Sequence, residues 1–337
     1  MRDVLVVGGG PAGLVTALHA ARAGLRVTVL DKRAGDGDKA CGEGLMPAAL
    51  RGLRELGVDP PGADIAGITY RQGQTVAVTR FRSGPGRGVR RTSLHAHLHR
   101  AVLAAGVEVL EGAAEEVVQH PDHVVAGGLR ARWLVAADGL HSPVRAALGL
   151  ARPSSQPRWG LRRHYALAPW TDTVEVTWGG VGEAYVTPVG PDTVGVAVLT
   201  STRGSYDDQL AAFPALRERI DGAEPASAVR GAGPLRQDVR RRVAGRVLLV
   251  GDAAGYVDAL TGEGIAVAVG SSRVLVQCLV AGDPQRYERE WRRVSRPYRV
   301  LTGGLLAARR SVLARGVVPA AAAAPWVFGR VVDRLAG

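Results

Sequence analysis

Short, continuous apolar runs recur along the chain, each bounded by glycines or by a helical stretch. Continuous apolarity over so few residues is typical of parallel strands that are buried on both faces. The runs are Val4–Val7, Arg26–Leu30, Trp133–Ala137 and Arg246–Val250. Because an alanine-rich helical stretch to about Ala23 separates the first two, the pattern predicts an α/β domain built on a parallel sheet.

A second pattern begins near Arg158, where apolar and polar residues alternate with a period of two up to Thr200. Such alternation is typical of antiparallel strands with one covered face. The expected strands are Gly160–Ala168, Thr173–Trp178, Glu183–Thr187 and Thr193–Leu199, joined by Ile65–Phe81. From Pro284 to Gly337 the chain reads as mostly helical. The predicted fold class is therefore α/β, a Rossmann-like domain with a parallel sheet, followed by an α+β layer with an antiparallel sheet and by C-terminal helices.

A glycine motif follows the first apolar run. Gly8–Gly13 reads Gly-x-Gly-x-x-Gly, it opens the first helical stretch, and Asp31 ends the next strand. In this context the glycines permit a tight turn and a close approach of the backbone to a pyrophosphate, which sits at the positive end of the helix. Asp31 is then placed to accept hydrogen bonds from a ribose. The motif predicts a dinucleotide site.

Two later segments place an aspartate beside a glycine at the end of a strand. Asp138–Arg145 follows the third run, and Gly251–Gly255 follows the fourth, with a Leu-Thr-Gly-Glu-Gly-Ile turn at 260–265 before another helical stretch. Ligands of open α/β sheets bind at the carboxyl ends of the strands, where these aspartates would lie. Each aspartate taken alone also fits a helix N-cap.

The composition of the chain indicates what kind of protein it is and where it is located, but it says little about the reaction. With 46% hydrophobic and 22% charged residues, the 337-residue chain is expected to be globular rather than disordered. The net charge of +12 is interpreted mainly as a solvated basic surface, with attraction to anionic ligands or a membrane face as the alternative. Two cysteines, Cys41 and Cys278, make no disulfide framework, and no apolar run is long enough to span a bilayer. We therefore expect a cytoplasmic protein that binds neither nucleic acid nor metal.

The three motifs in this order resemble the FAD-dependent oxidoreductases of the para-hydroxybenzoate hydroxylase fold, which include aromatic hydroxylases, flavin halogenases and geranylgeranyl reductases. The resemblance implies an FAD-binding domain over residues 1–60, 91–150 and 240–282. It also implies an antiparallel-sheet substrate domain over 61–90 and 151–239, and leaves a C-terminal helical segment at 283–337.

The same resemblance implies which residues hold FAD. Asp252 would bind the ribityl chain, and the turn at 262–265 would start a helix aimed at the flavin. Arg91, which begins an Arg-x-x-Leu-x-x-x-Leu spacing with Leu94 and Leu98, would pair with the pyrophosphate. The full set is Gly8, Gly10, Pro11, Ala12, Gly13, Asp31, Lys32, Cys41, Gly42, Glu43, Arg91, Asp138, Gly139, Asp252, Gly262, Gly264 and Ile265.

Two segments resemble the reductase branch in particular. Cys41–Leu45 is similar to the Cys-Gly-Gly-Gly-Leu stretch of geranylgeranyl reductases, with Glu43 in place of the middle glycine, and residues 251–265 are also similar to that branch. Cys41 is interpreted either as an acid or redox group beside the flavin or as an inert thiol. Halogenation is disfavoured because the chain has no lysine beyond Lys39.

Catalytic candidates come from the antiparallel strands and from the cysteine. If the sheet roofs the flavin, strand parity predicts Arg163, Tyr165, Tyr185 and Thr187 on the cavity wall, with His164 on the opposite parity. His164 is either a base for a phenol or a structural histidine. The candidates for catalysis are Arg163, His164, Tyr185 and Cys41.

The resemblance supports two reactions. The favoured one is an NAD(P)H- and O₂-dependent monooxygenase, in which a C4a-hydroperoxyflavin hydroxylates a phenolic or other hydrophobic polyketide-like or lipid-like molecule. The alternative is reduction of a polyprenyl double bond, with Cys41, Tyr185 or Tyr256 as proton donor. NAD(P)H would be a transient reductant in the first reaction. The C-terminal helices are expected to dock onto the flavin domain, with a peripheral membrane contact as the alternative.

Overall fold

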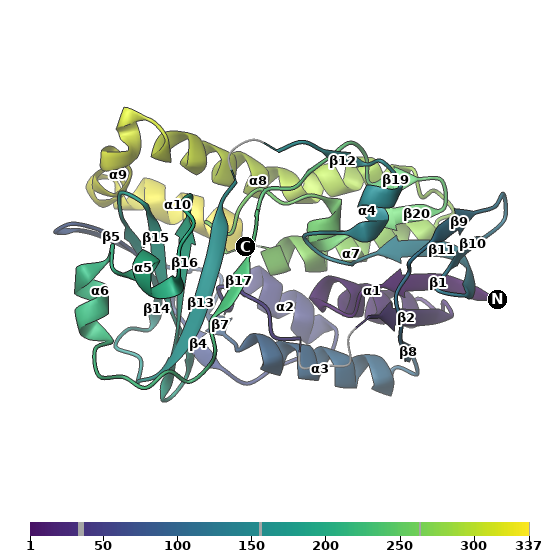
Figure 1. Cartoon of the computed structure of the whole chain (residues 1–337), viewed down its shortest axis with the longest axis horizontal. Helices are drawn as coiled ribbons and strands as arrows, with labels where there is room; N and C mark the ends of the chain where they lie inside the picture. The colour runs from purple at the N-terminus through teal and green to yellow at the C-terminus, as the bar shows by residue number, and fades with distance from the viewer. Residues whose placement is uncertain (33–36, 155–156, 263, 337) are drawn as a thin grey trace.

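The two large sheets lie at opposite ends of an elongated molecule in the computed structural model, which describes residues 1–32, 37–154, 157–262 and 264–336 (Figure 1). The eight-stranded sheet has the order β19-β20-β11-β1-β2-β8, with β10 and β9 continuing from β11. Its strands are β1 (Arg2–Val7), β2 (Val27–Asp31), β8 (Glu108–Glu111), β9 (Val117–Gln119), β10 (Val124–Ala126), β11 (Leu129–Ala136), β19 (Val243–Ala244) and β20 (Val247–Leu249).

The central strands of this sheet are parallel, as the continuous apolar runs predict. β1 pairs in parallel with β2 and β11, and β11 pairs in parallel with β20. Leu5, Val6 and Leu134 are completely buried, because helices cover the sheet. The covering helices are α1 (Pro11–Arg22), α3 (Arg91–Ala104) and α7 (Gly264–Val280), and the short α4 (Pro143–Ala147) follows β11. A buried hydrogen bond of 2.8 Å between the hydroxyls of Thr16 and Ser272 joins α1 to α7.

The second large sheet contains the predicted alternating strands. Its order is β17-β13-β16-β15-β14-β5-β6, and every pair is antiparallel except β14 with β5. The strands are β5 (Gly67–Gln72), β6 (Thr75–Arg80), β13 (Trp159–Ala166), β14 (Thr173–Trp178), β15 (Gly182–Gly190), β16 (Thr193–Thr200) and β17 (Arg230–Ala232). The single stretch expected near Ile65–Phe81 is a hairpin of β5 and β6.

Smaller elements connect the two sheets. They are the three-stranded sheet of β3 (Gly44–Leu45), β7 (Gly86–Gly88) and β4 (Ala63–Ile65), the pair β12 (Ala151–Arg152) and β18 (Asp238–Val239), the helix α2 (Pro47–Glu55) and the 3₁₀ turn η1 (Gly251–Ala254). Helices α5 (Tyr206–Leu210) and α6 (Pro214–Arg219) cover one face of the antiparallel sheet, where Tyr206 and Leu216 pack on Val196.

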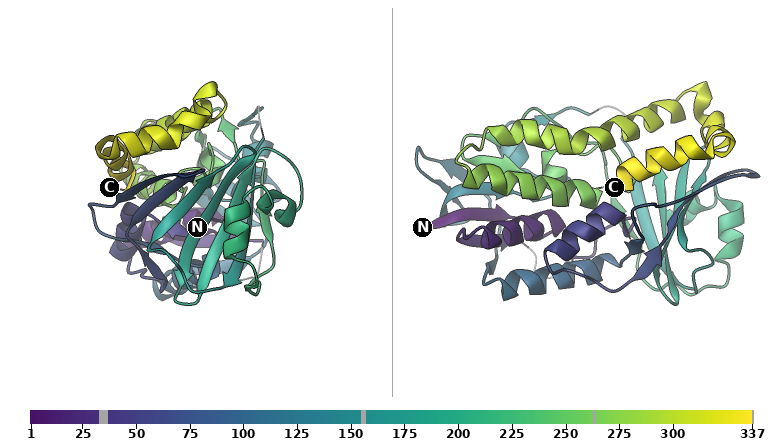
Figure 2. Two further views of the ribbon diagram at one scale, coloured as in Figure 1. Left: turned by 90° about the vertical axis from the view of Figure 1, so that its left-hand side faces the viewer. Right: turned by 180° about the vertical axis from the view of Figure 1, so that it is seen from behind.

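The C-terminal helices join both parts of the molecule. They are α8 (Arg286–Arg309), η2 (Val312–Gly316), α9 (Val317–Ala323) and α10 (Pro325–Ala336). Helix α8 packs on α7 and runs along the molecule to the antiparallel sheet (Figure 2). There α9 and α10 cover β5 and β6, with the rings of Phe328 and Tyr70 5.2 Å apart. Within the described residues, no helix combines the length and the apolar character that crossing a bilayer requires.

Candidate functional site

The glycine motif after β1 has close contacts that only glycine allows. Gly8 has φ +108°, and a Cβ there would lie 2.5 Å from the carbonyl oxygen of Ala137. A Cβ on Gly13 would lie 1.9 Å from the carbonyl oxygen of Gly8, so α1 can pack against the strand end only without a side chain. The carboxylate of Asp31 lies over Gly9, since a Cβ on Gly9 would lie 2.3 Å from Asp31 Oδ2. These contacts place the acid of β2 beside the turn, as the motif predicts.

A cavity of about 720 Å³ begins at this turn and extends to the antiparallel sheet. Its first end is lined by Gly10, Pro11, Ala12, Arg91 and Asp252. Its other end has an apolar wall, formed by Ile68, Tyr70, Val174, Val176, Tyr185, Ala197 and Leu199. The cavity therefore connects the dinucleotide motif to a surface suited to an apolar molecule.

Polar groups at the first end are arranged for an anionic ligand with hydroxyl groups. The Nε of Arg91 is buried and has no hydrogen-bond partner among the described residues. Burial raises the pKa of Asp252, although the charges of Arg91, Lys39 and Arg145 lower it. An unsatisfied guanidinium group fits a pyrophosphate, and a buried carboxylate fits a hydroxylated chain whose hydroxyl groups would donate hydrogen bonds to it. The residues present thus fit FAD.

The aspartate after β11 has a different placement from the one expected. Asp138 does not line the cavity, and its Oδ2 accepts a 3.0 Å hydrogen bond from the Val144 amide at the start of α4. The helix-capping interpretation thus describes its contact, and the adjacent Gly139 lines the cavity instead. Sequence reasoning missed the role of Arg145, which donates to the carbonyls of Leu140 and Ala253 and so ties the two Asp-Gly motifs together.

Glu43 organises the loop between β2 and α2. It has φ 59°, a left-handed conformation that favours glycine, and its side chain is buried. Its Oε1 accepts a 2.7 Å hydrogen bond from the Arg91 amide, and its Oε2 lies 2.5 Å from His164 Nε2. The glutamate therefore links the loop to α3 and to β13. Beside it, Gly42 opens onto empty space, because a Cβ there would meet no atom within 4 Å.

Cys41 lines the cavity in the same loop. Its Sγ accepts a 3.4 Å hydrogen bond from the Glu43 amide. Burial raises the pKa of the thiol, while the charge of Arg91 lowers it. The net upward shift keeps the side chain a protonated thiol at neutral pH, so Cys41 is suited to donate a proton rather than to attack as a thiolate.

The parity predicted for β13 is wrong. Arg163 lies on the face away from the cavity, 3.3 Å from Asp207 and over the ring of Tyr206, and Tyr165 packs in the same cluster. His164 points toward the cavity side but lies behind Glu43, almost fully buried, and does not line the cavity. Both faces of β13 are covered, so alternation could not show which one meets the ligand.

The face of β13 that carries His164 also carries a residue that the sequence analysis missed. Arg162 lines the cavity and forms an ion pair with Asp38, and it donates a 3.1 Å hydrogen bond to the Lys39 carbonyl. The only signal in the sequence that could have identified Arg162 is that it lies two residues from His164 and so on the same face of the strand.

The remaining candidates line the cavity, with the exception of Lys32. Tyr185 and Thr187 line the cavity as expected, and their hydroxyls donate to the carbonyls of Leu260 and Gly42, both at 2.9 Å. Tyr256 also lines the cavity, and burial raises the pKa of Tyr185. At the start of α7, Gly262, Gly264 and Ile265 line the cavity too. Lys32 is exposed and does not line it.

Comparison with known proteins agrees with this geometry. A family model described as "FAD binding domain" matches residues 1–100 and 107–282. The chain is 30% identical to a menaquinone reductase of Mycobacterium tuberculosis (strain ATCC 25618 / H37Rv), covering 84% of this chain and 78% of the relative. It is 32% identical to a chloroplastic geranylgeranyl diphosphate reductase of Oryza sativa subsp. japonica, covering 88% and 73%.

Solved structures show the same fold at lower identity. A flavoprotein/dehydrogenase from Cytophaga hutchinsonii superposes with a TM-score of 0.80 at 19% identity, covering 91% of this chain and 87% of that one. The flavin-dependent halogenase CmlS superposes with a TM-score of 0.76 at 22% identity over 88% of this chain. This chain spans 63% of the length of that halogenase.

Proposed function

This chain belongs to the FAD-binding domain family, and we propose that it is a flavin-dependent reductase of a carbon–carbon double bond in an isoprenoid chain. It is an FAD-dependent oxidoreductase. The observation that carries the finer proposal is the identity of 30% and 32% to two reductases, one named for menaquinone and one for geranylgeranyl diphosphate, over more than four fifths of the chain. Both of those molecules contain isoprenoid units.

The two ends of the cavity support this substrate class. Arg91, Asp252 and the turn of Gly10 would hold FAD at one end, and the wall of β5, β14, β15 and β16 would exclude water around an apolar chain. Bound FAD supplies the two electrons of the reduction, which NAD(P)H would replenish. The protein must then orient the double bond and deliver a proton to it.

Cys41 is the proton donor that the geometry favours. Its thiol lines the cavity and stays protonated, as its raised pKa indicates. By contrast, the hydroxyl of Tyr185 already donates its proton to the Leu260 carbonyl. Tyr256 remains an alternative donor at the cavity wall.

Hydroxylation, which the sequence analysis favoured, is the second candidate. The apolar wall would also accept a phenolic or polyketide-like molecule, and the same cavity would exclude water from the oxygen reaction. We rank it lower because the two relatives are named reductases, whereas the halogenase likeness at 22% identity concerns the fold.

A membrane contact remains part of the proposal. Helix α10 exposes Trp326, Val327 and Val331, with Arg330 beside them. An apolar and basic helix face of this kind suits the headgroup region of a lipid surface from which an isoprenoid substrate is drawn.

Anaerobic reoxidation separates the two candidate reactions. The FAD-loaded enzyme is reduced without oxygen and mixed with geranylgeranyl diphosphate or with menaquinone, and flavin absorbance and product mass are followed. We expect reoxidation of the flavin together with a product that has gained two hydrogen atoms in its isoprenoid chain, which for menaquinone is checked after any quinol has been oxidised back to the quinone. The proposal is overturned if neither compound reoxidises the flavin and a phenol is instead hydroxylated when oxygen is admitted.

A further inference from the structure

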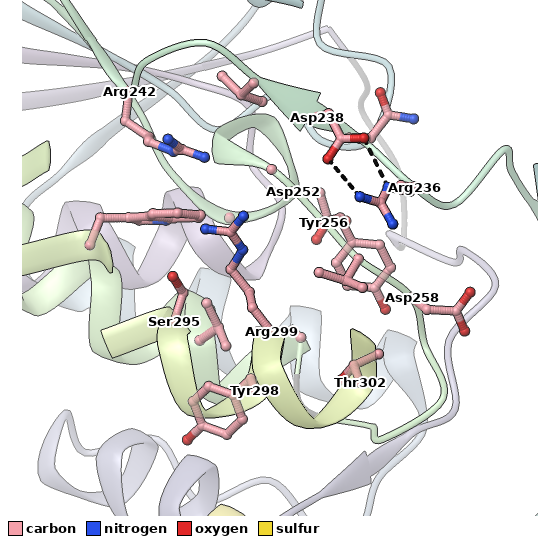
Figure 3. A pocket seen from close by; sticks show the side chains of 18 of the residues that line it. Arg236, Asp238, Arg242, Asp252, Tyr256, Asp258, Ser295, Tyr298, Arg299 and Thr302 are labelled. Carbon is pink, nitrogen blue, oxygen red and sulfur yellow. Dashed lines mark hydrogen bonds and ion pairs between the residues drawn. The ribbon is translucent and has the colours of Figure 1, made fainter. Parts of the chain in front are cut away.

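A second cavity, of about 420 Å³, lies between α8 and the segment around β18 (Figure 3). It is distinct from the large cavity, but both share one wall. The shared residues are Gly251, Asp252, Tyr256, Thr261 and Gly264. The second cavity thus reaches the FAD-binding segment from the side of the C-terminal helix.

Arginines dominate the charge of this second cavity. Arg152, Arg236, Arg242 and Arg299 line it. Arg242 lies 3.8 Å from the ring centroid of Trp291, and Arg299 lies 5.3 Å from the same centroid. Two cations therefore share one ring, and repulsion by Arg299 adds to burial in lowering the pKa of Arg242.

Of the three aspartates that line this cavity, Asp252 belongs to the wall shared with the large cavity, and the other two already have cationic partners. Asp238 pairs with Arg236 at 2.8 Å, and Asp258 lies 3.5 Å from Arg158. Arg242 pairs with Glu288 at 3.0 Å. Among the four arginines that line the cavity, Arg299 and Arg152 have no carboxylate at ion-pair distance and no recorded side-chain hydrogen bond within the described part of the chain, and of these two only Arg299 lies over the ring of Trp291.

A buried hydroxyl without a partner lies one helical turn from Arg299. Ser295 is 1% exposed, and its Oγ has no hydrogen-bond partner among the described residues. Positions four apart lie on the same face of a helix, and Figure 3 shows the Ser295 hydroxyl and the Arg299 guanidinium beside the same space. A buried polar atom that the protein leaves unsatisfied indicates that something else satisfies it.

We infer that this second cavity binds the phosphate or diphosphate group of a small molecule. Arg299 offers a planar array of donors that matches phosphate oxygens, and Ser295 adds a hydroxyl donor. Arg242, 3.8 Å from the centroid of the same Trp291 ring, adds a second positive charge nearby. The phosphate would come either from a nicotinamide nucleotide, whose rings suit the faces of Tyr256 and Tyr298, or from a prenyl diphosphate.

Binding of inorganic pyrophosphate tests the site directly. Isothermal titration uses the FAD-loaded protein, so that the FAD pyrophosphate site is already filled. We expect Arg299→Gln to weaken binding by about tenfold or more and Ser295→Ala to weaken it several-fold. Arg296→Gln is the matched control, because Arg296 is exposed on the same helix and does not line the cavity.

The inference is overturned if pyrophosphate does not bind, if Arg299→Gln leaves the affinity unchanged, or if Arg296→Gln weakens binding equally. FAD content, measured in each variant, shows that the fold is retained. Only the source of the phosphate rests on the proposed function. A raised KM for NADPH in Arg299→Gln identifies the reductant, and a raised KM for geranylgeranyl diphosphate identifies the substrate. If pyrophosphate binds but both KM values stay unchanged, the assignment to either molecule is overturned.

Discussion

At the scale of single residues, Glu43 shows why a side chain can replace glycine at a strained position. Its left-handed backbone costs about 1 kcal/mol or more relative to glycine. Against this, its carboxylate accepts the Arg91 amide hydrogen and contacts His164 inside the protein, and hydrogen bonds to a charged group contribute about 1.5–3 kcal/mol each. The contacts outweigh the strain.

Replacing Glu43 by glycine should therefore destabilise the protein, although it relieves the backbone. We expect Glu43→Gly to lower the free energy of unfolding by about 2 kcal/mol, because the Nε2 of the buried His164 is left without its partner. Urea unfolding of the FAD-free protein measures this. Glu43→Gln, which retains the backbone strain and the shape, is the comparison. A Glu43→Gly protein more stable than the unmodified one would show that the strain dominates.

Cys41 carries the second prediction at this scale. If its thiol donates the proton, Cys41→Ala should lower the rate of substrate reduction by about 10²-fold, the usual contribution of a positioned acid. Reduction of FAD by NAD(P)H should keep its rate, because that step does not use the thiol. Single-turnover kinetics separates the two steps. Cys278→Ala removes the other thiol, in α7 away from the cavity, and should leave both rates intact. Equal rates in Cys41→Ala and the unmodified enzyme would assign the proton to another group.

At the scale of elements, strand existence could be predicted and strand orientation could not. The ends predicted for β14 agree with the structure. The segment Thr173–Trp178 has alternating polar and apolar residues, and turn residues flank it on both sides. In β13, residues on both faces are buried, one face by the loop of Glu43 and the other by α5. A shift of one residue reverses every side chain of a strand, so a pattern without an exposed face leaves the orientation undetermined.

Helix α8 is attached to the antiparallel sheet by a buried ion cluster. Arg309 Nε lies 2.9 Å from Glu183 Oε1, and Arg158 binds the same carboxylate. Glu183 is completely buried. Burial raises its pKa while the two arginines lower it. The carboxylate therefore depends on both cations to stay charged inside the protein.

Removing one of these cations should loosen the end of α8. We expect Arg309→Ala to lower the free energy of unfolding by about 3 kcal/mol, because an uncompensated charge remains buried. Arg293→Ala, on the same helix and largely exposed, should have no measurable effect. Thermal unfolding of both variants provides the comparison. Equal stability of the two variants would mean that Arg158 alone compensates Glu183.

At the scale of the whole molecule, the cavity depends on packing that no local pattern encodes. The motifs of Gly8–Gly13, Arg91 and Asp252 could be recognised because each needs particular residues at a fixed spacing. The apolar wall and the second cavity arise where α8 and the antiparallel sheet meet residues 251–262, and those elements are far apart in the sequence. From the sequence alone, Ser295 and Arg299 therefore cannot be distinguished from other residues of the helix, because only the packing of distant elements puts them on a cavity wall.

The FAD site also makes the stability of the FAD-free protein depend on pH. Burial raises the pKa of Asp252 above its ordinary value of 3.8. Above that value the unfolded chain has released the proton while the folded protein still holds it, so stability from this group falls as the pH rises through the folded pKa. Asp252→Asn removes the cost of a buried charge. In urea unfolding of FAD-free protein, it should therefore stabilise the fold more at about pH 8 than near pH 3.8, the ordinary pKa of the group.

The same substitution should weaken FAD binding, because Asp252 lines the cavity where the cofactor lies. Bound FAD stabilises the folded protein by mass action, by about 4 kcal/mol at a thousand times its dissociation constant. In the absence of FAD, Asp252→Asn should thus unfold at a higher temperature than the unmodified protein. When FAD is added, the unfolding temperature of the variant should rise by less than that of the unmodified protein. If Asp252→Asn is instead less stable than the unmodified protein at the higher pH without FAD, the carboxylate of Asp252 is needed as a partner for the nearby cations. The attraction between that carboxylate and Arg91, Lys39 and Arg145 would then stabilise the empty site.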